Sequence, residues 1–232
     1  MKYVIANWKM NMGSKEILGW SGAFSKKYKN IKKDWKKRKI IEERWPRVII
    51  CPSLIYVPAM CDIAGKMGVN IGVQDVSSLD RGAHTGDTGA FQIKDFCRYA
   101  IIGHSERQEN IEDVIKKRDL CLRDNITPII CFVNPADLPS LHKEGCIIAW
   151  ENPQNISVGG VYRSEEPEKI EAIAKEIRKI IPSETPLIYG GSVNEKNASQ
   201  ISRIREIDGV LVGNASLDSE TFTDIIRYYV QD

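Results

Sequence analysis

Short runs of apolar, often β-branched residues recur along this chain, separated by longer segments in which apolar residues follow helical spacing. Within each run the apolar residues are continuous rather than alternating, which is typical of parallel strands covered by helices. The runs are Tyr3–Ala6, Val48–Cys51, Val69–Val73, Ala100–Gly103, Pro128–Phe132, Cys146–Trp150, Pro186–Tyr189 and Gly209–Val212. The pattern therefore predicts eight strands, each followed by a connecting segment.

Four connecting segments carry clear helical signals. They are Ile55–Met67, Ile111–Asp124, Pro167–Ile181 and Ser219–Tyr229, the last one capped by Asp218. Only residues 133–145 separate the fifth run from the sixth, which leaves room for no more than a short helix. Eight β–α units in sequence favour the α/β class, as a (β/α)8 barrel with a shortened fifth helix.

Composition fits one soluble globular domain covering residues 1–232. Apolar residues make up 42% of the chain and charged residues 28%, which excludes collagen-like, disordered and disulfide-scaffold proteins. The six cysteines are scattered without C-x-x-C spacing, so we expect reduced, mostly buried thiols. No apolar run approaches the roughly 20 residues of a membrane span, and the chain enters a strand at once. We therefore expect a cytoplasmic protein with no membrane partner.

The segment from Lys26 to Arg47 is the one compositional outlier. Half of its residues are Lys or Arg, and Trp35 and Trp45 are interleaved with them, although the net charge of the whole chain is only +2. One interpretation is a surface for nucleic acid or another anionic partner; the other is a solvated helix face with the Trp rings on its packed side. We favour the second interpretation and expect no nucleic-acid partner.

Polar residues at strand ends point to chemistry, because active sites of such barrels lie at the C-terminal ends of the strands. Asn7 and Lys9 follow the first strand and lie two residues apart, so both are expected to face the barrel mouth. His104 follows the fourth strand, where a neutral imidazole can polarise a carbonyl. Glu151 follows the sixth strand and is the natural general base.

Glycine-containing turns follow the seventh and eighth strands. They read Gly190-Gly191-Ser192 and Gly213-Asn214, and backbone amides at such turns bind phosphate. A phosphate anchor beside a carboxylate, an imidazole and a cation indicates a site that moves a proton on a sugar phosphate. This chemistry requires neither a metal nor a cofactor.

Five parts of the sequence resemble signatures of the triosephosphate isomerase family, in the order in which that family has them. They are Ala6–Asn11, Gly72–Val76 followed by Gly82–Asp87, Ile102–Arg107, Tyr189–Val193 and Leu211–Leu217. The resemblance covers essentially the whole chain. It implies interconversion of dihydroxyacetone phosphate and D-glyceraldehyde 3-phosphate, a step shared by glycolysis and gluconeogenesis.

The resemblance also implies a role for each catalytic residue. Glu151 would abstract the proton next to the carbonyl, and neutral His104 would donate a hydrogen bond to the enediolate oxygens. Lys9 would stabilise the negative charge that develops on oxygen, and Asn7 would help to hold the substrate. Glu106 would orient Lys9 or take part in proton transfer.

For the phosphate group, the resemblance implies backbone amides of Ser192, Gly213 and Asn214, with a further amide near Ser157. The loop that contains Ser157 follows Glu151 and departs from the family's usual sequence, so the closure of this loop over the substrate is expected to be altered.

The third loop carries an expectation about assembly. Thr85 and its neighbours match the segment that, in this family, reaches into a partner subunit. Asp87 and Arg107 match positions that form an ion pair across that interface in relatives. The resemblance thus implies a homodimer, with a tetramer as the alternative because the fifth helix is short.

Two other functions stay open. The first is a phosphate-binding barrel isomerase that acts on a larger sugar phosphate. The second is a barrel that has lost catalysis and binds an anionic partner through Lys26–Arg47. Retention of Lys9, His104 and Glu151 together argues against both alternatives.

Overall fold

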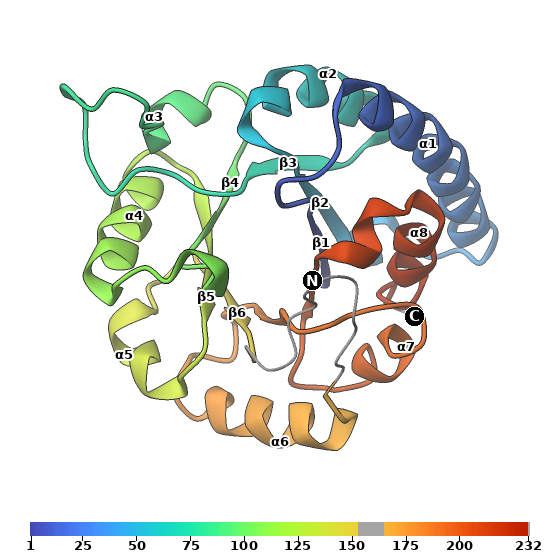
Figure 1. Ribbon diagram of the computed structural model, residues 1–232. Helices are drawn as coiled ribbons and strands as arrows, with labels where there is room; N and C mark the ends of the chain where they lie inside the picture. Colours follow the sequence, from blue (N-terminus) through green and yellow to red (C-terminus); the bar gives the residue numbers. More distant parts are fainter. Residues whose placement is uncertain (153–164, 232) are drawn as a thin grey trace.

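The computed structural model describes residues 1–152 and 165–231, and within them eight parallel strands close into a barrel with helices around the outside (Figure 1). The strands pair in sequence order, and β1 pairs with β8 to complete the closure. Their bounds are β1 Tyr3–Asn7, β2 Arg47–Cys51, β3 Asn70–Val73, β4 Tyr99–Ile102, β5 Thr127–Phe132, β6 Ile147–Trp150, β7 Leu187–Tyr189 and β8 Gly209–Val212. The predicted barrel is confirmed, with every strand at its expected place.

The helices vary widely in length. They are α1 Ser14–Lys37, α2 Val57–Met67, α3 Ala90–Ile93, α4 Ile111–Arg123, α5 Leu138–Leu141, α6 Pro167–Arg178, α7 Ala198–Ile201 and α8 Ser219–Arg227. The fifth helix is short as predicted, at four residues, but α3 and α7 have the same length. Asp218 caps α8 as expected, because its carboxylate accepts a hydrogen bond from the Thr221 backbone.

The predicted basic segment lies largely on α1 and the turn after it. Trp35 is buried, and Trp45 packs against it with ring centroids 5.4 Å apart. Lys29, Lys33 and most other basic side chains of this segment are exposed. This is the arrangement expected for a solvated helix face whose Trp rings lie on the packed side.

Two apolar clusters form the core. The larger one fills the space between the strands and the helices, and includes Trp20 and Phe24 of α1 stacked 4.7 Å apart beside Phe222 of α8. The smaller one fills the barrel interior with side chains such as Ile5 and Ile101. The barrel is therefore a packed core rather than a channel, and ligands can approach only at its mouth.

The described residues contain no helix that is long and apolar enough to cross a membrane. All six cysteines are free thiols, and only Cys61 is partly exposed, as the scattered spacing predicted.

Candidate active site

The cavity at the C-terminal end of the barrel joins residues that lie far apart in the sequence. Most of the predicted catalytic and phosphate-binding residues line it together. Its lining consists of Asn7, Lys9, His104, Glu151, Gly190, Gly191, Ser192, Val193, Leu211, Gly213 and Asn214. The strand-end reasoning therefore identified a real juxtaposition, because parallel strands of a barrel all end at the same rim.

Lys9 is held in an unusual backbone conformation just after β1. Its φ angle is +50°, a region that non-glycine residues seldom adopt, so neighbouring groups must hold it there. The Lys9 amide donates to Asn7 Oδ1 at 3.0 Å, and the Lys9 carbonyl accepts from Gln74 Nε2 at 2.9 Å and from Ser53 Oγ at 3.2 Å. The Lys9 ammonium is 2.5 Å from Glu106 Oε1, and the role of Glu106 in orienting Lys9 or in proton transfer stays a prediction.

His104 presents one ring nitrogen to the cavity. Its Nδ1 accepts a hydrogen bond from the backbone amide of Glu106 at 3.2 Å, at the start of the 3-10 turn Ser105–Arg107. Because Nδ1 accepts this hydrogen bond, Nε2 is the ring nitrogen left to donate toward the cavity. His104 is buried, and its Nε2 lies against the Glu151 side chain.

Glu151 is the most buried charged side chain of the site, at 1% exposed. Its Oε1 lies 3.2 Å from His104 Nε2, and its Oε2 accepts a hydrogen bond from the Ser105 amide at 2.9 Å. Burial and the adjacent Glu151 carboxylate raise the pKa of the Cys131 thiol well above its ordinary value. Cys131 thus stays a protonated thiol beside the Glu151 side chain.

The two glycine turns lie directly beside Glu151 and Lys9, because β7 pairs with β6 and β8 pairs with β1. A Cβ atom on Gly190 would lie 3.0 Å from Glu151 Cγ, and one on Gly213 would lie 3.5 Å from Lys9 Cε. Ser216 closes the second turn, because its amide and its hydroxyl both donate to the Gly213 carbonyl. Bare backbone at both turns leaves room for an anionic group beside the cation and the base.

Some predicted site residues lie elsewhere. Ser157 lies outside the described residues. Thr85 and Asp87 are exposed on the loop between β3 and α3, where Asp87 accepts a hydrogen bond from Ser77. Arg107 forms an ion pair with Asp75 of its own chain at 2.8 Å. Whether these three residues contact a second subunit stays a prediction.

Sequence reasoning missed Gln74, whose amide also donates to the Cys51 carbonyl. Gln74 directly follows the third strand, so the strand-end argument used for Lys9 and His104 could also have identified it as a polar residue at the rim. The described residues contain no group of three or more His, Cys, Asp or Glu side chains arranged to hold a metal ion.

Comparison with known proteins agrees with this geometry. The sequence model of the triosephosphate isomerase family matches residues 2–229. The chain is 29% identical to the triosephosphate isomerase of Thermus thermophilus over 97% of both chains, and 31% identical to that of Legionella pneumophila over 78% of this chain and 84% of the relative.

A solved structure shares the fold. The crystal structure of triosephosphate isomerase from Bartonella henselae superposes with a TM-score of 0.80 over 99% of both chains, at 24% identity. Together with the match to the family over nearly the whole chain, these results show that the chain belongs to the triosephosphate isomerase family and is an enzyme with that family's isomerase activity.

Proposed function

We propose that the protein interconverts dihydroxyacetone phosphate and D-glyceraldehyde 3-phosphate through an enediolate, with Glu151 as the base and His104 as the electrophile. The observation that carries these roles is the 3.2 Å contact between Glu151 Oε1 and His104 Nε2 in one cavity with Lys9. A base and a hydrogen-bond donor this close can act on neighbouring atoms of one small substrate.

In the proposed reaction, the Glu151 carboxylate removes a proton from the carbon next to the substrate carbonyl. His104 donates from Nε2 to the oxygens on which charge develops, and the Lys9 ammonium, which lines the same cavity, stabilises that charge. Glu106 holds the Lys9 ammonium in place through the 2.5 Å contact. The hydroxyl proton passes to the former carbonyl oxygen by way of His104 Nε2, and Glu151 returns the carbon-bound proton to the adjacent carbon. Both protons are thus accounted for without a metal or a cofactor.

The phosphate group is proposed to bind at the two glycine turns, through backbone amides of Ser192, Gly213 and Asn214, with an amide near Ser157 completing the set. Asn7 supports this end of the site, because its side-chain oxygen fixes the Lys9 amide. These turns lie across the mouth from His104, and a phosphate anchored there leaves the other carbons of a triose near the base.

For assembly and location, we propose a homodimer in the cytoplasm, with a tetramer as the alternative. The exposed loop that carries Thr85 and Asp87 supports this, since it extends away from the barrel between β3 and α3 (Figure 1). Sedimentation equilibrium of the purified chain distinguishes monomer, dimer and tetramer.

The test of the proposed roles is a coupled assay of glyceraldehyde 3-phosphate isomerisation, with the parent chain, Glu151→Gln and the exposed control Glu144→Gln. Loss of a general base typically costs about 100- to 10,000-fold in rate, so Glu151→Gln should lose nearly all activity while Glu144→Gln keeps it. An inactive parent, or a Glu151→Gln variant as active as the parent, would contradict the proposal. Activity on larger sugar phosphates alone would favour the other barrel isomerase.

A further inference from the structure

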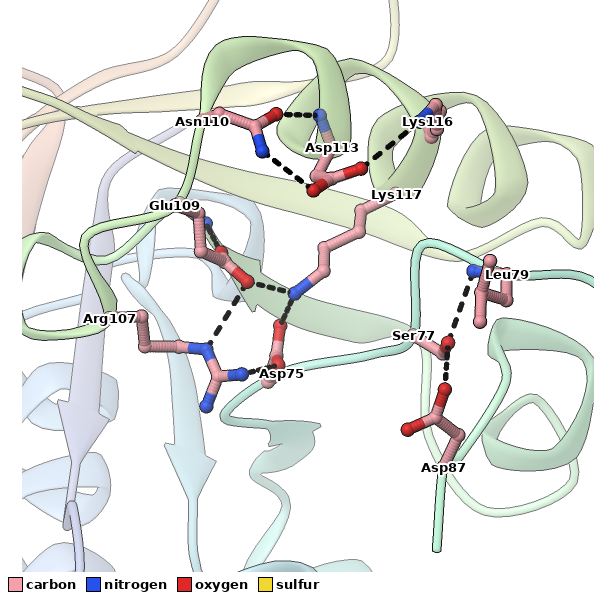
Figure 2. Close-up of polar contacts among 11 residues, drawn as sticks. Asp75, Ser77, Leu79, Asp87, Arg107, Glu109, Asn110, Asp113, Lys116 and Lys117 are labelled. Carbon is pink, nitrogen blue, oxygen red and sulfur yellow. Dashed lines mark hydrogen bonds and ion pairs between the residues drawn. The ribbon is translucent and has the colours of Figure 1, made fainter. Parts of the chain in front are cut away.

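Four charged side chains form a closed ring of ion pairs beside the mouth, between the loops after β3 and β4 (Figure 2). Asp75 contacts the Lys117 ammonium at 2.6 Å and Arg107 Nη2 at 2.8 Å. Glu109 contacts Arg107 Nε at 3.3 Å and also pairs with Lys117. Each acid therefore meets both bases, and each base meets both acids.

Because Lys117 is buried, removing one of its ion-pair partners is energetically unfavourable. Lys117 lies on α4 with only 4% of its surface exposed. Burial alone would raise the pKa of Glu109, but hydrogen bonds from Lys117, Arg107 and Gly103 bring it below its ordinary value. For Asp75, burial raises the pKa despite the same two cations. Lys117 and Glu109 are the more buried members of the ring, whereas Arg107 is half-exposed, so removing the partner of either of these two charges is the more destabilising change.

One corner of the ring reaches the backbone of the catalytic loop. Glu109 Oε2 accepts a hydrogen bond from the Gly103 amide at 3.1 Å, and Gly103 directly precedes His104. Gly103 has a φ of +69°, and a Cβ there would lie 2.9 Å from the Cys131 carbonyl and 3.1 Å from Val114. Packing on one side and Glu109 on the other thus fix the Ile102–Gly103 peptide, one residue before His104.

The opposite corner reaches Lys9. Asp75 directly follows Gln74, whose side-chain amide donates to the carbonyls of Lys9 and Cys51 at 2.9 Å each. The ring therefore joins the backbone that restrains Lys9 to the backbone that carries His104.

We propose that Glu109 and Lys117 are positioning residues for catalysis, which set the placement of His104 by holding the Gly103 amide. This inference rests on the proposed function, in which His104 Nε2 donates to the enediolate. It concerns the transition state, because a neutral donor binds the developing oxyanion more strongly than the ground-state carbonyl. Loosening the peptide should therefore lower kcat and leave KM nearly unchanged.

A merely structural ring would behave differently. Buried ion pairs often contribute little net stability, and removing one partner destabilises the fold without a selective effect on the reaction. The distinguishing feature is the acceptor at position 109. Glutamine keeps an oxygen for the Gly103 amide while it removes the charge, whereas alanine removes both.

The experiment compares Glu109→Ala, Glu109→Gln and the control Glu112→Ala, a neighbouring exposed carboxylate in the first turn of α4. A displacement of about 1 Å in a catalytic group costs on the order of a hundredfold. We expect kcat of folded Glu109→Ala to fall ten- to a hundredfold, with KM within about twofold. Glu109→Gln should recover most of this loss, and Glu112→Ala should match the parent.

Lys117→Met tests the ring independently, with the exposed neighbour Lys116→Met as its control. Figure 2 shows Lys117 reaching Glu109 and Asp75 while Lys116 contacts Asp113 instead. We expect a smaller fall in kcat for Lys117→Met than for Glu109→Ala, again without a large change in KM, and no change for Lys116→Met. If Glu109→Ala does not fold, Lys117→Met decides the question.

Nuclear magnetic resonance of the imidazole nitrogens gives a readout that general destabilisation does not move. The chain has three histidines, so the His104 signals are readily assigned. They should shift or broaden in Glu109→Ala and return toward parent positions in Glu109→Gln. Parent-like kcat and His104 signals in folded Glu109→Ala would overturn the inference, as would equal losses in the Ala and Gln variants. An inactive parent would instead overturn the proposed function.

Discussion

Gly209 lies where the barrel closes, and its replacement by alanine offers a sharp test of the fold. The residue begins β8 and pairs with Tyr3 of β1. A Cβ atom at this position would lie 2.0 Å from the Tyr3 carbonyl oxygen and 2.8 Å from the Tyr3 nitrogen. These are backbone atoms of the neighbouring strand, so no side chain can turn aside to make room.

The size of the effect follows from the distance. Close contacts between carbon and oxygen are about 3.3 Å, so β1 and β8 must separate by more than about 1 Å at this point. Overpacking of this kind costs about 1–3 kcal/mol, and a lost ladder hydrogen bond about 1 kcal/mol. With two such bonds weakened, we expect Gly209→Ala to lower the free energy of unfolding by about 3–5 kcal/mol.

Thermal unfolding followed by circular dichroism measures this change. For a chain of this length each kcal/mol corresponds to roughly 2–4 °C, so Tm should fall by about 6–20 °C. The matched control is Gly19→Ala in α1, where a new Cβ would have no heavy atom within 4 Å. Alanine there should stabilise the helix by about 0.5–1 kcal/mol. A Gly209→Ala variant that melts within about 2 °C of the parent would refute the steric reasoning.

Two further predictions concern α8. Phe222→Ala removes a fully buried ring whose centroid is 6.0 Å from that of Phe24. We expect the free energy of unfolding, measured in urea, to fall by about 3–5 kcal/mol. A fall below about 1 kcal/mol would contradict this prediction. Asp218→Ala removes the cap on the Thr221 amide and should cost about 1 kcal/mol at pH 7. Hydrogen bonds from the Thr221 backbone and side chain lower the pKa of Asp218 in the folded state. The stability that Asp218 contributes is therefore fully present above its unfolded-state pKa, and it is lost as pH falls through its folded-state pKa. Melting curves of parent and variant should converge in acid, and a constant difference at all pH values would be inconsistent with a charged cap.

Strand positions were predictable to within about one residue, and the differences have local causes. Val69 was expected in the third strand, but its amide bonds to Ala64 at the end of α2, where Gly68 takes a φ of +71°. Gly103 was expected in the fourth strand, but its left-handed conformation ends β4 at Ile102. Positive φ angles at glycine are decided by neighbouring packing, which apolar periodicity does not report.

The long helix α1 was not predicted as such, although its signal was present. Its buried positions include Ile17, Trp20, Phe24, Tyr28 and Ile31, which recur every three or four residues. The many basic residues between these positions make the segment stand out by charge rather than by its apolar spacing. Composition thus obscured a periodicity that by itself predicts an amphipathic helix.

In the site, strand-end position identified Lys9, His104 and Glu151 because the barrel brings all strand ends to one rim. The roles of Gln74 and Glu109 were not predictable in this way, since both act on backbone groups: Gln74 on those of Lys9 and Cys51, and Glu109 on the Gly103 amide within its own loop. Such contacts depend on how each loop folds and packs, which the residue pattern of strands and strand ends does not report.

Pairing of Tyr3 with Gly209 also has a consequence for biosynthesis. The edge of β1 that pairs with β8 has no partner until β8 is synthesised, about 200 residues later. At ordinary elongation rates this interval is roughly 10–40 s. During that interval β1 can pair on one side only, with β2, and its other edge is open to pairing with a second nascent chain. Barrel closure is therefore a late event in synthesis. On polysomes, where nascent chains lie close together, chaperones would be most needed to keep the open edge of β1 from pairing with another chain.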